Sequence, residues 1–417
     1  MVRLSSLGGL LFLVCSALAL SQSTEKLSLK EAVGIALQAN PEVLSARGGI
    51  DAAKGRFWRG VSPPPASLSW NYDYIPTGSS LGGYGERTIE ITQSIDFPTT
   101  IALRGSSLSS ETDAADADYR YTALAVTQQV KEAYYGVLAK QQKLRLAQEN
   151  LSIADDFARK AEIRHNVGEG TNLERLTAKV QRTQAQNGVE TARSELRVAT
   201  GVLNLALGRG KDRSGLELIL TDSLVYHPYS LGLEPLVEEA HQSNPQVQSA
   251  AFRTNAASVN RTIAWSSILP SLSVSYSRQV QGGNFNLYGM AFGVSLPVWF
   301  LFDQRGQVEE AAAKHAIAES DLLAKQNFVS MDVKNSYQEF INDERQVQLY
   351  QNDLLPQAQE VYRSAATSYE AGEITYIEFL QARQTLISAR SSYIDALYHY
   401  NAALTRLEKA VGRSIAD

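Results

Sequence analysis

The sequence predicts a mainly α-helical fold that is built twice and carries a membrane-spanning β part. Three landmark segments recur about 204 positions downstream, which chance rarely gives over nearly a whole chain. They are residues 36–43 and 240–247, 167–171 and 371–375, and 206–209 and 410–413. The hydrophobic period also changes, from 3.6 in long runs to 2 in two short segments. We therefore expect two copies of one unit of long coiled-coil helices plus a β-hairpin.

The composition is that of an ordinary folded protein. The 417 residues are 44% hydrophobic and 20% charged, and the net charge is −5. A chain of this length has room for two or three domains. Its mild acidity and the lack of a basic cluster exclude nucleic acid as an expected partner.

The first 19 residues have the pattern of a secretory signal peptide. Arg3 precedes an apolar run over 7–20, and small residues suit cleavage after Ala19. The alternative is a retained anchor, but about 14 apolar residues are short for a span that needs ~20. Cys15, the only cysteine, is an alternative lipidation site that fits poorly because Val14 precedes it. The expected mature protein has no disulfide.

Each expected copy opens with two short helices. The first copy covers 20–209 and begins with helices over 29–40 and 42–60. Proline at position 41 separates them, because it lacks a donor and restricts the residue before it. We expect a linker over 210–230, a second copy over 231–413 and a tail over 414–417.

A β-hairpin follows in each copy, over about 66–97 and about 271–297. Strands of about 10 residues match the length that crosses a bilayer when tilted. Four strands are too few to close a barrel, so closure in a membrane needs strands from several subunits. The alternative is a half-buried hairpin in a soluble sandwich. The polar positions expected to line a wet lumen are Ser67, Ser69, Asn71, Asp73, Ser271, Ser273 and Ser275.

Long helices come next, over about 105–165 and about 306–370. Small and apolar residues recur at heptad steps, and some 60 residues span on the order of 90 Å. The pattern fits a coiled-coil rod and the wall of a helical tube equally well. Pro356 predicts a kink or break in the second long helix. Turns at Gly168 and Gly372 lead to return helices over about 172–207 and 376–411.

No pattern in the sequence indicates catalysis. The five histidines are scattered without metal-ligand spacing. Phosphate-binding, dinucleotide-binding and nucleophile-elbow motifs are missing. We expect no enzyme activity, no cofactor and no resident metal.

Together these features resemble the TolC-like outer-membrane efflux protein family over almost all of the mature chain. The most specific marks are two Asn-Pro pairs, two strand ends that run into Arg-Gly, and the two glycine turns. They are Asn40-Pro41, Asn244-Pro245, Ile95-Asp96-Phe97-Pro98, Ser295-Leu296-Pro297, Arg104-Gly105, Arg305-Gly306, Val167-Gly168 and Ala371-Gly372. The strand end over 93–98 is most similar to the heavy-metal efflux branch.

The resemblance implies a trimeric α-helical tunnel in the periplasm below a shared 12-stranded β-barrel in the outer membrane. It implies a passive channel that completes a tripartite pump with a periplasmic adaptor (membrane fusion) protein and an inner-membrane transporter. The alternative is a periplasmic coiled-coil structural or adaptor protein with a soluble β-domain. The sequence does not name the exported compound.

In that family the adaptor docks at the turns between long and return helices. By residue, the resemblance points to Val167, Gly168, Glu169, Thr171, Ala371, Gly372, Glu373 and Thr375. The alternative is plain helix capping. Family members often carry two acidic residues after the second turn, where they form a periplasmic gate. Glu378 matches the first position but Gln381 occupies the second, so we expect a less charged gate, or a Glu378 that only caps its helix.

Overall fold

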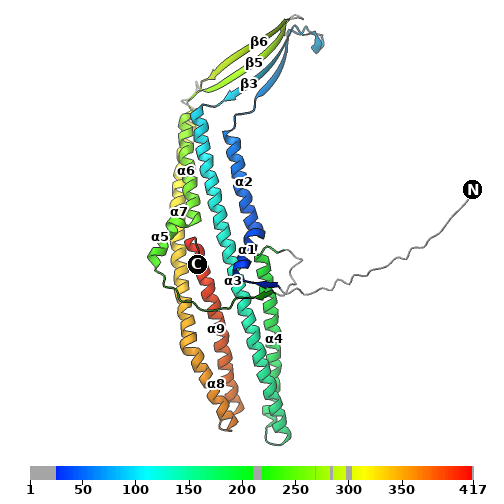
Figure 1. Ribbon diagram of the computed structural model, residues 1–417, viewed down its shortest axis with the longest axis vertical. Helices are drawn as coiled ribbons and strands as arrows, with labels where there is room; N and C mark the ends of the chain where they lie inside the picture. The colour runs from blue at the N-terminus through cyan, green and yellow to red at the C-terminus, as the bar shows by residue number, and fades with distance from the viewer. Residues whose placement is uncertain (1–24, 210–217, 268, 282–284, 297–302, 416–417) are drawn as a thin grey trace, which may run out of the picture.

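The molecule is an elongated bundle of helices with a β-sheet at one end (Figure 1). The computed structural model describes residues 25–209, 218–267, 269–281, 285–296 and 303–415. The expected signal peptide, Cys15 and part of the expected linker lie outside the described residues. No helix among the described residues is both long and apolar enough to span a membrane. The fold is mainly helical with some sheet, as the sequence predicts.

Two pairs of short helices flank the middle of the bundle. They are α1 (Leu29–Ala39) with α2 (Pro41–Val61), and α5 (Leu233–Ser243) with α6 (Pro245–Ser266). Proline occupies the first position of α2 and of α6, where its missing N–H costs nothing. The asparagine before each proline caps the helix, so one dipeptide both ends a helix and starts the next.

Both capping asparagines also reach a return helix. The Asn40 amide donates to the Ala206 carbonyl oxygen at 2.9 Å, and its Oδ1 accepts from the Glu42 N–H at 2.8 Å. Asn244 repeats the arrangement with the Ala410 carbonyl oxygen at 2.8 Å. Each asparagine is buried, so the two bonds satisfy a side chain that would otherwise be costly to bury. The start of each half is thereby fixed to its end.

The strands of the two hairpins form one antiparallel sheet in the order β2-β3-β5-β6. The strands are β2 (Ser67–Asp73), β3 (Glu86–Ile95), β5 (Ser271–Gln281) and β6 (Phe285–Ser295). At 7 residues, β2 is shorter than the predicted length of about 10. A second sheet pairs β1 (Glu25–Leu27) in parallel with β4 (Leu218–Leu220), where the sequence predicted only a linker.

The register of the large sheet separates an apolar face from a polar one. Leu68 lies opposite Ile91, which lies opposite Tyr276, which lies opposite Met290. This row is exposed across its whole width, and Phe292 on the same face is 76% exposed. Ser67, Thr92 and Ser275 share a row on the other face. The predicted alternation is therefore present, and its apolar side is uncovered in a single chain.

Two long helical segments run away from the sheet and return by shorter helices. α3 (Pro98–Asn166) has 69 residues and begins at its proline, earlier than predicted. The second segment is α7 (Asp303–Leu349), a π-helical turn (Tyr350–Leu354) and α8 (Leu355–Glu370). The break expected at Pro356 is this π turn, since the proline cannot donate four residues back. The return helices are α4 (Asn172–Ala206) and α9 (Tyr376–Val411).

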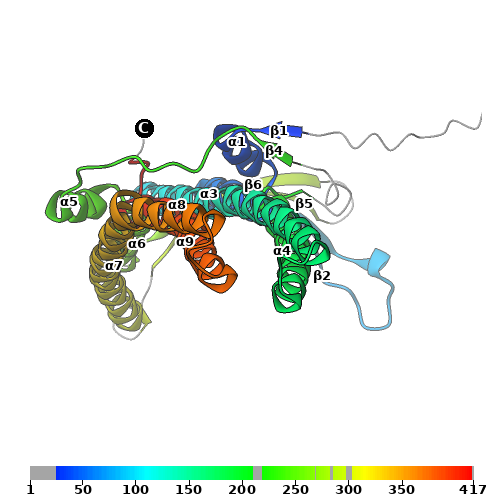
Figure 2. The ribbon, with the colours of Figure 1, turned by 90° about the horizontal axis from the view of Figure 1, so that it is seen from below.

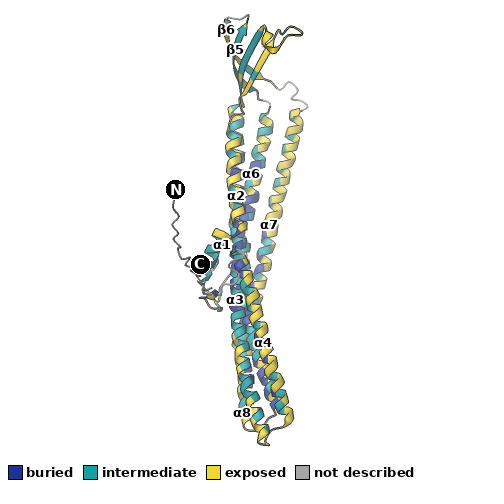
Figure 3. Ribbon diagram, turned by 90° about the vertical axis from the view of Figure 1, so that its right-hand side faces the viewer, coloured by how far each residue is buried: buried dark blue, intermediate teal, exposed yellow. Residues whose placement is uncertain are grey.

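The core lies in the middle of the bundle, where buried residues are concentrated (Figure 3). Tyr134, Phe340, Tyr400 and Leu407 are its large buried side chains, supplied by α3, α7 and α9. Seen along the long axis, α1 and the β1–β4 pair lie together on one side of the long helices (Figure 2). The Tyr134 hydroxyl donates to Asp222 and lies 2.9 Å from the Leu27 carbonyl oxygen, and so joins α3 to that side.

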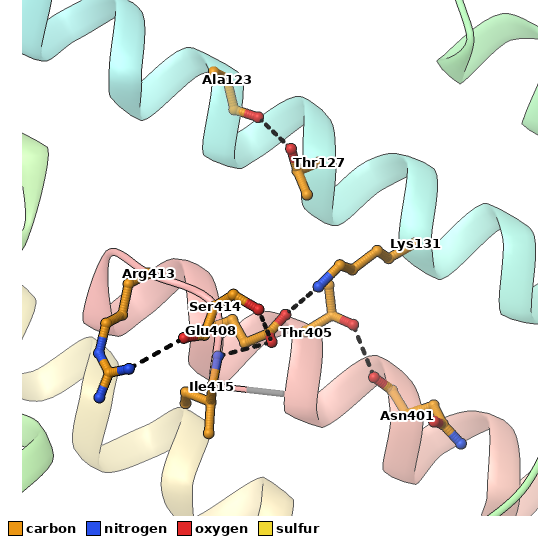
Figure 4. Close-up of polar contacts among 9 residues, drawn as sticks. All are labelled: Ala123, Thr127, Lys131, Asn401, Thr405, Glu408, Arg413, Ser414 and Ile415. Carbon is orange, nitrogen blue, oxygen red and sulfur yellow. Dashed lines mark hydrogen bonds and ion pairs between the residues drawn. The ribbon is translucent and has the colours of Figure 1, made fainter. Parts of the chain in front are cut away.

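A partly buried ion pair holds the end of α9 against α3 (Figure 4). The Lys131 ammonium lies 2.6 Å from Glu408 Oε2. Glu408 Oε1 accepts from the Ser414 hydroxyl and from the Ile415 N–H, both at 3.0 Å. The carboxylate thus receives bonds from a neighbouring helix and from the chain that follows α9.

Gly208 tests the asparagine corner. Its φ is +72°, and an added Cβ would lie 2.6 Å from the Ala39 carbonyl oxygen. Gly372 has a similar φ of +76° but no atom within 4 Å of an added Cβ. We expect Gly372→Ala to cost about 1–2 kcal/mol for the left-handed backbone alone, and Gly208→Ala to cost about 1–3 kcal/mol more because backbone must move. Thermal unfolding of both variants measures this difference, and equal midpoints would contradict it.

Candidate functional site

Two helical turns at the end of the molecule opposite the sheet carry the predicted site residues (Figure 1). Gly168 and Gly372 adopt positive φ values of +83° and +76°, which glycine reaches without strain. The following N–H groups of Glu169 and Glu373 donate back to carbonyl oxygens of Arg164 and Ser368, each at 2.9 Å. Both glycines therefore act as helix C-caps, as predicted.

The exposed residues of the two turns form a continuous set at this end. Val167 is 65% exposed, although it is apolar. The other predicted docking residues, which are also exposed, are Gly168, Glu169, Thr171, Ala371, Gly372, Glu373 and Thr375. The fold therefore presents both turns to the outside at one end of the chain.

The return helices begin with threonine caps that differ in one respect. Thr171 Oγ1 accepts from the Glu174 N–H at 3.1 Å, and Thr375 Oγ1 accepts from the Glu378 N–H at 3.3 Å. Only the second cap is reciprocal: Glu378 Oε2 accepts from the Thr375 N–H at 2.7 Å. This backbone hydrogen bond lowers the pKa of Glu378. Glu378 thus caps its helix while remaining exposed, and Gln381 is exposed one turn further along α9.

Glu174 makes a different contact, which joins the two turns. Its Oε1 accepts from the Tyr369 hydroxyl at 2.6 Å, and Arg164 lies 3.4 Å from the same atom. Burial, followed by the hydrogen bond to Glu174, raises the pKa of Tyr369. Sequence reasoning missed this contact, because the spacing of Thr171 and Glu174 indicated only a cap.

An aromatic cluster lies behind the turns and packs α3, α8 and α9 together. The rings of Phe157 and Phe379 are 4.6 Å apart, and those of Tyr369 and Phe379 are stacked at 5.3 Å. Tyr376 and Tyr362 complete the cluster. These rings fix the position of both turns, since their residues come from the first and second halves of the chain.

A groove of about 410 Å³ runs between the two turns. Its residues come from both, among them Arg164, Thr171, Glu174, Tyr369, Gly372 and Thr375. In the described part of the chain, no group of three or more His, Cys, Asp or Glu side chains is placed to hold a metal ion. The groove offers hydrogen-bonding groups on two hairpin ends, an arrangement suited to protein contacts.

Comparison with known proteins gives the chain a family. The model of the outer membrane efflux protein family matches residues 66–209 and 236–413, most of the chain. The chain is 23% identical to the cobalt-zinc-cadmium resistance protein CzcC of Cupriavidus metallidurans, over 68% of this chain and 67% of that protein. It is 22% identical to the outer membrane protein TolC of Vibrio cholerae, over 96% and 94%.

Solved structures show the same fold. The structure of CusC aligns with a TM-score of 0.75 at 17% identity, covering 93% of this chain and 92% of that one. The outer membrane protein VceC of Vibrio cholerae also aligns at 0.75, with 16% identity, 93% and 96% coverage. The chain therefore belongs to the outer membrane efflux protein family and is an outer-membrane channel of a tripartite efflux system, with its helical part in the periplasm.

Proposed function

We propose that three copies of this chain form a passive export duct, each giving four strands to one 12-stranded β-barrel. The observation that carries the proposal is the sheet. Among the described strands, β2 and β6 each have a neighbour on one side only, so the sheet has two open edges. Its apolar face is exposed, whereas exposed edges and apolar patches are normally covered by a partner or a membrane. Pooling strands satisfies the edges, and outer-membrane lipid covers the face.

We further propose that the polar face lines a wet lumen and that the chain is a duplicated unit. Gly289 and Gly293 on β6 face Ser277 and Ser273, leaving no room for larger side chains there. The matching asparagine corners support residues 20–209 and 231–413 as two copies, after a signal peptide over 1–19. β4 makes part of the segment between them more than a simple linker. The duct itself moves no substrate against a gradient, because family members are channels rather than enzymes.

The two turns are the proposed docking surface for a periplasmic adaptor, which would link the duct to an inner-membrane transporter. Supporting the proposal, both turns are exposed at the end farthest from the sheet, and the Tyr369–Glu174 contact keeps them together. Glu378 and Gln381 are the proposed periplasmic gate. Similarity to CzcC, a cobalt-zinc-cadmium resistance protein, favours divalent metal ions as the exported cargo.

Membrane fractionation and light scattering test the duct. We expect the protein in the outer-membrane fraction, and a detergent-extracted particle of three chains that dissociates only on heating. The alternative, a periplasmic adaptor with a soluble β-domain, would extract in buffer as a monomer or dimer. That outcome would overturn the shared barrel.

Val167→Asp tests the docking surface. Val167 is exposed, so we expect an unchanged thermal midpoint, while a charge in an apolar contact weakens adaptor binding at least about tenfold. Val361→Asp, the same change at an exposed site on α8, is the control. Binding is measured with the purified adaptor on immobilised channel. Equal binding by both variants would remove Val167 from the interface.

Glu378 tests the gate through its charge. Its pKa lies below its usual 4.5, so the carboxylate stays ionised at pH values where an ordinary glutamate is half protonated. In planar bilayers we expect cation selectivity to persist at pH 4.5 and fall only at lower pH. Glu378→Gln keeps the capping spacing but should lose the selectivity, and Gln381→Glu should increase it. Unchanged selectivity in Glu378→Gln would leave Glu378 as a cap alone.

A further inference from the structure

A small cavity lies between α3, α8 and α9, beside the aromatic cluster. Its volume is about 120 Å³, and it is lined by Asn150 of α3, Tyr362 of α8 and Arg383 of α9. Glu149 and Arg390, which also line it, are partly exposed and lie 3.4 Å apart as an ion pair. Leu146, Ile153, Leu386 and Ile387 form the rest of the wall. The cavity is thus apolar except for these five side chains.

Arg383 is the unusual member of this wall. The residue is only 4% exposed. Its Nη2 donates to Asn150 Oδ1 at 2.7 Å, but its Nη1 is buried without a hydrogen-bond partner among the described residues. Burial also lowers the pKa of Arg383, although a guanidinium keeps its proton in proteins. A permanent positive charge is therefore held in a poorly solvated place.

Such a charge needs a counter-ion. A buried charge is costly unless it is paired and hydrogen-bonded. In the part of the chain that the structure describes, Arg383 forms no ion pair with a carboxylate, and its side-chain partner Asn150 is neutral. Glu149, the acidic residue in the wall, is already balanced by Arg390. The wall as a whole carries one excess positive charge.

The size of the cavity limits what can supply the negative charge. A water molecule takes up about 30 Å³ in the liquid, so 120 Å³ holds roughly four water-sized particles. This fits a monovalent ion of chloride size with a few waters. It excludes a bulky organic anion. The unpartnered Nη1 and the amide NH₂ of Asn150 provide donors from two helices.

We propose that this cavity binds a small monovalent anion such as chloride, held by Arg383, and that the bound anion joins α3 to the α8–α9 hairpin. The inference rests on the cavity within one chain and does not require the trimer or the docking surface. It places an anion-dependent contact on α9, the helix that also carries Glu378 and Gln381.

Bromide gives the direct test, because it replaces chloride and scatters X-rays anomalously. Crystals of the detergent-extracted full chain are grown in sodium bromide. We expect an anomalous peak within hydrogen-bond distance of Arg383 Nη1. Water alone in the cavity, or bromide only at exposed lysines, would overturn the proposal.

Thermal unfolding gives the second test, at one ionic strength with chloride exchanged for gluconate, which is too large for the cavity. We expect the wild-type midpoint to rise by about 2 °C or more with chloride, since a ligand of the folded state stabilises it. Arg383→Met should lose this dependence. Arg363→Met, which removes an exposed arginine on α8 that pairs with Glu360, should retain it.

Asn150→Asp provides a test that does not depend on Arg383→Met folding. The new carboxylate would stand 2.7 Å from Nη2 and supply the missing negative charge from the chain itself. We expect this variant to have a raised midpoint in gluconate, no response to chloride and no bromide peak at Arg383. An Asn150→Asp variant that still responds to chloride like the wild type would contradict the proposed site.

Discussion

The architecture depends on the hydrogen bonds by which one buried asparagine in each half joins a helix start to a return helix. Asn40 and Asn244 cap α2 and α6 and, through the same amide, hold the last carbonyl groups of α4 and α9. Gly208 and Gly412 pass so close to these corners that no side chain fits. Because each corner fixes where a return helix ends, it also fixes how far the turns project beyond the core.

The sheet imposes the opposite constraint, since one chain cannot satisfy it. Tyr276 and Met290 lie opposite each other on a face that nothing in the chain covers. The serines of the other face are matched with glycine or alanine on β6, so this side is polar and narrow in cross-section. A surface with one apolar and one polar side, open at both edges, is stable only with neighbouring strands and lipid. The helices need no such partner for their own core.

Periodicity and repeated landmarks were enough to predict the type and order of the long elements. They were too weak for β1 and β4, because three-residue strands carry no period and their partners lie far apart in the sequence. The π turn before Pro356 was predicted only as a break, since a proline signals the lost bond but not how the backbone accommodates it. Arg383 gave no signal either: in the sequence it is one more cation on an amphipathic helix, and only packing buries it.

The two turns show how equal sequence spacing gives unequal sites. Glu174 and Glu378 both stand three residues after a capping threonine, yet only Glu378 completes the reciprocal cap. Tyr369 explains the difference, because its hydroxyl draws the Glu174 carboxylate away from Thr171. By the offset between the halves, the position of Tyr369 is held in the first half by His165, whose ring contacts the Gly170 carbonyl oxygen instead. Glu378 is therefore left exposed and held ionised by its own helix start. One glutamate joins the hairpins, and the other keeps its charge for the proposed gate.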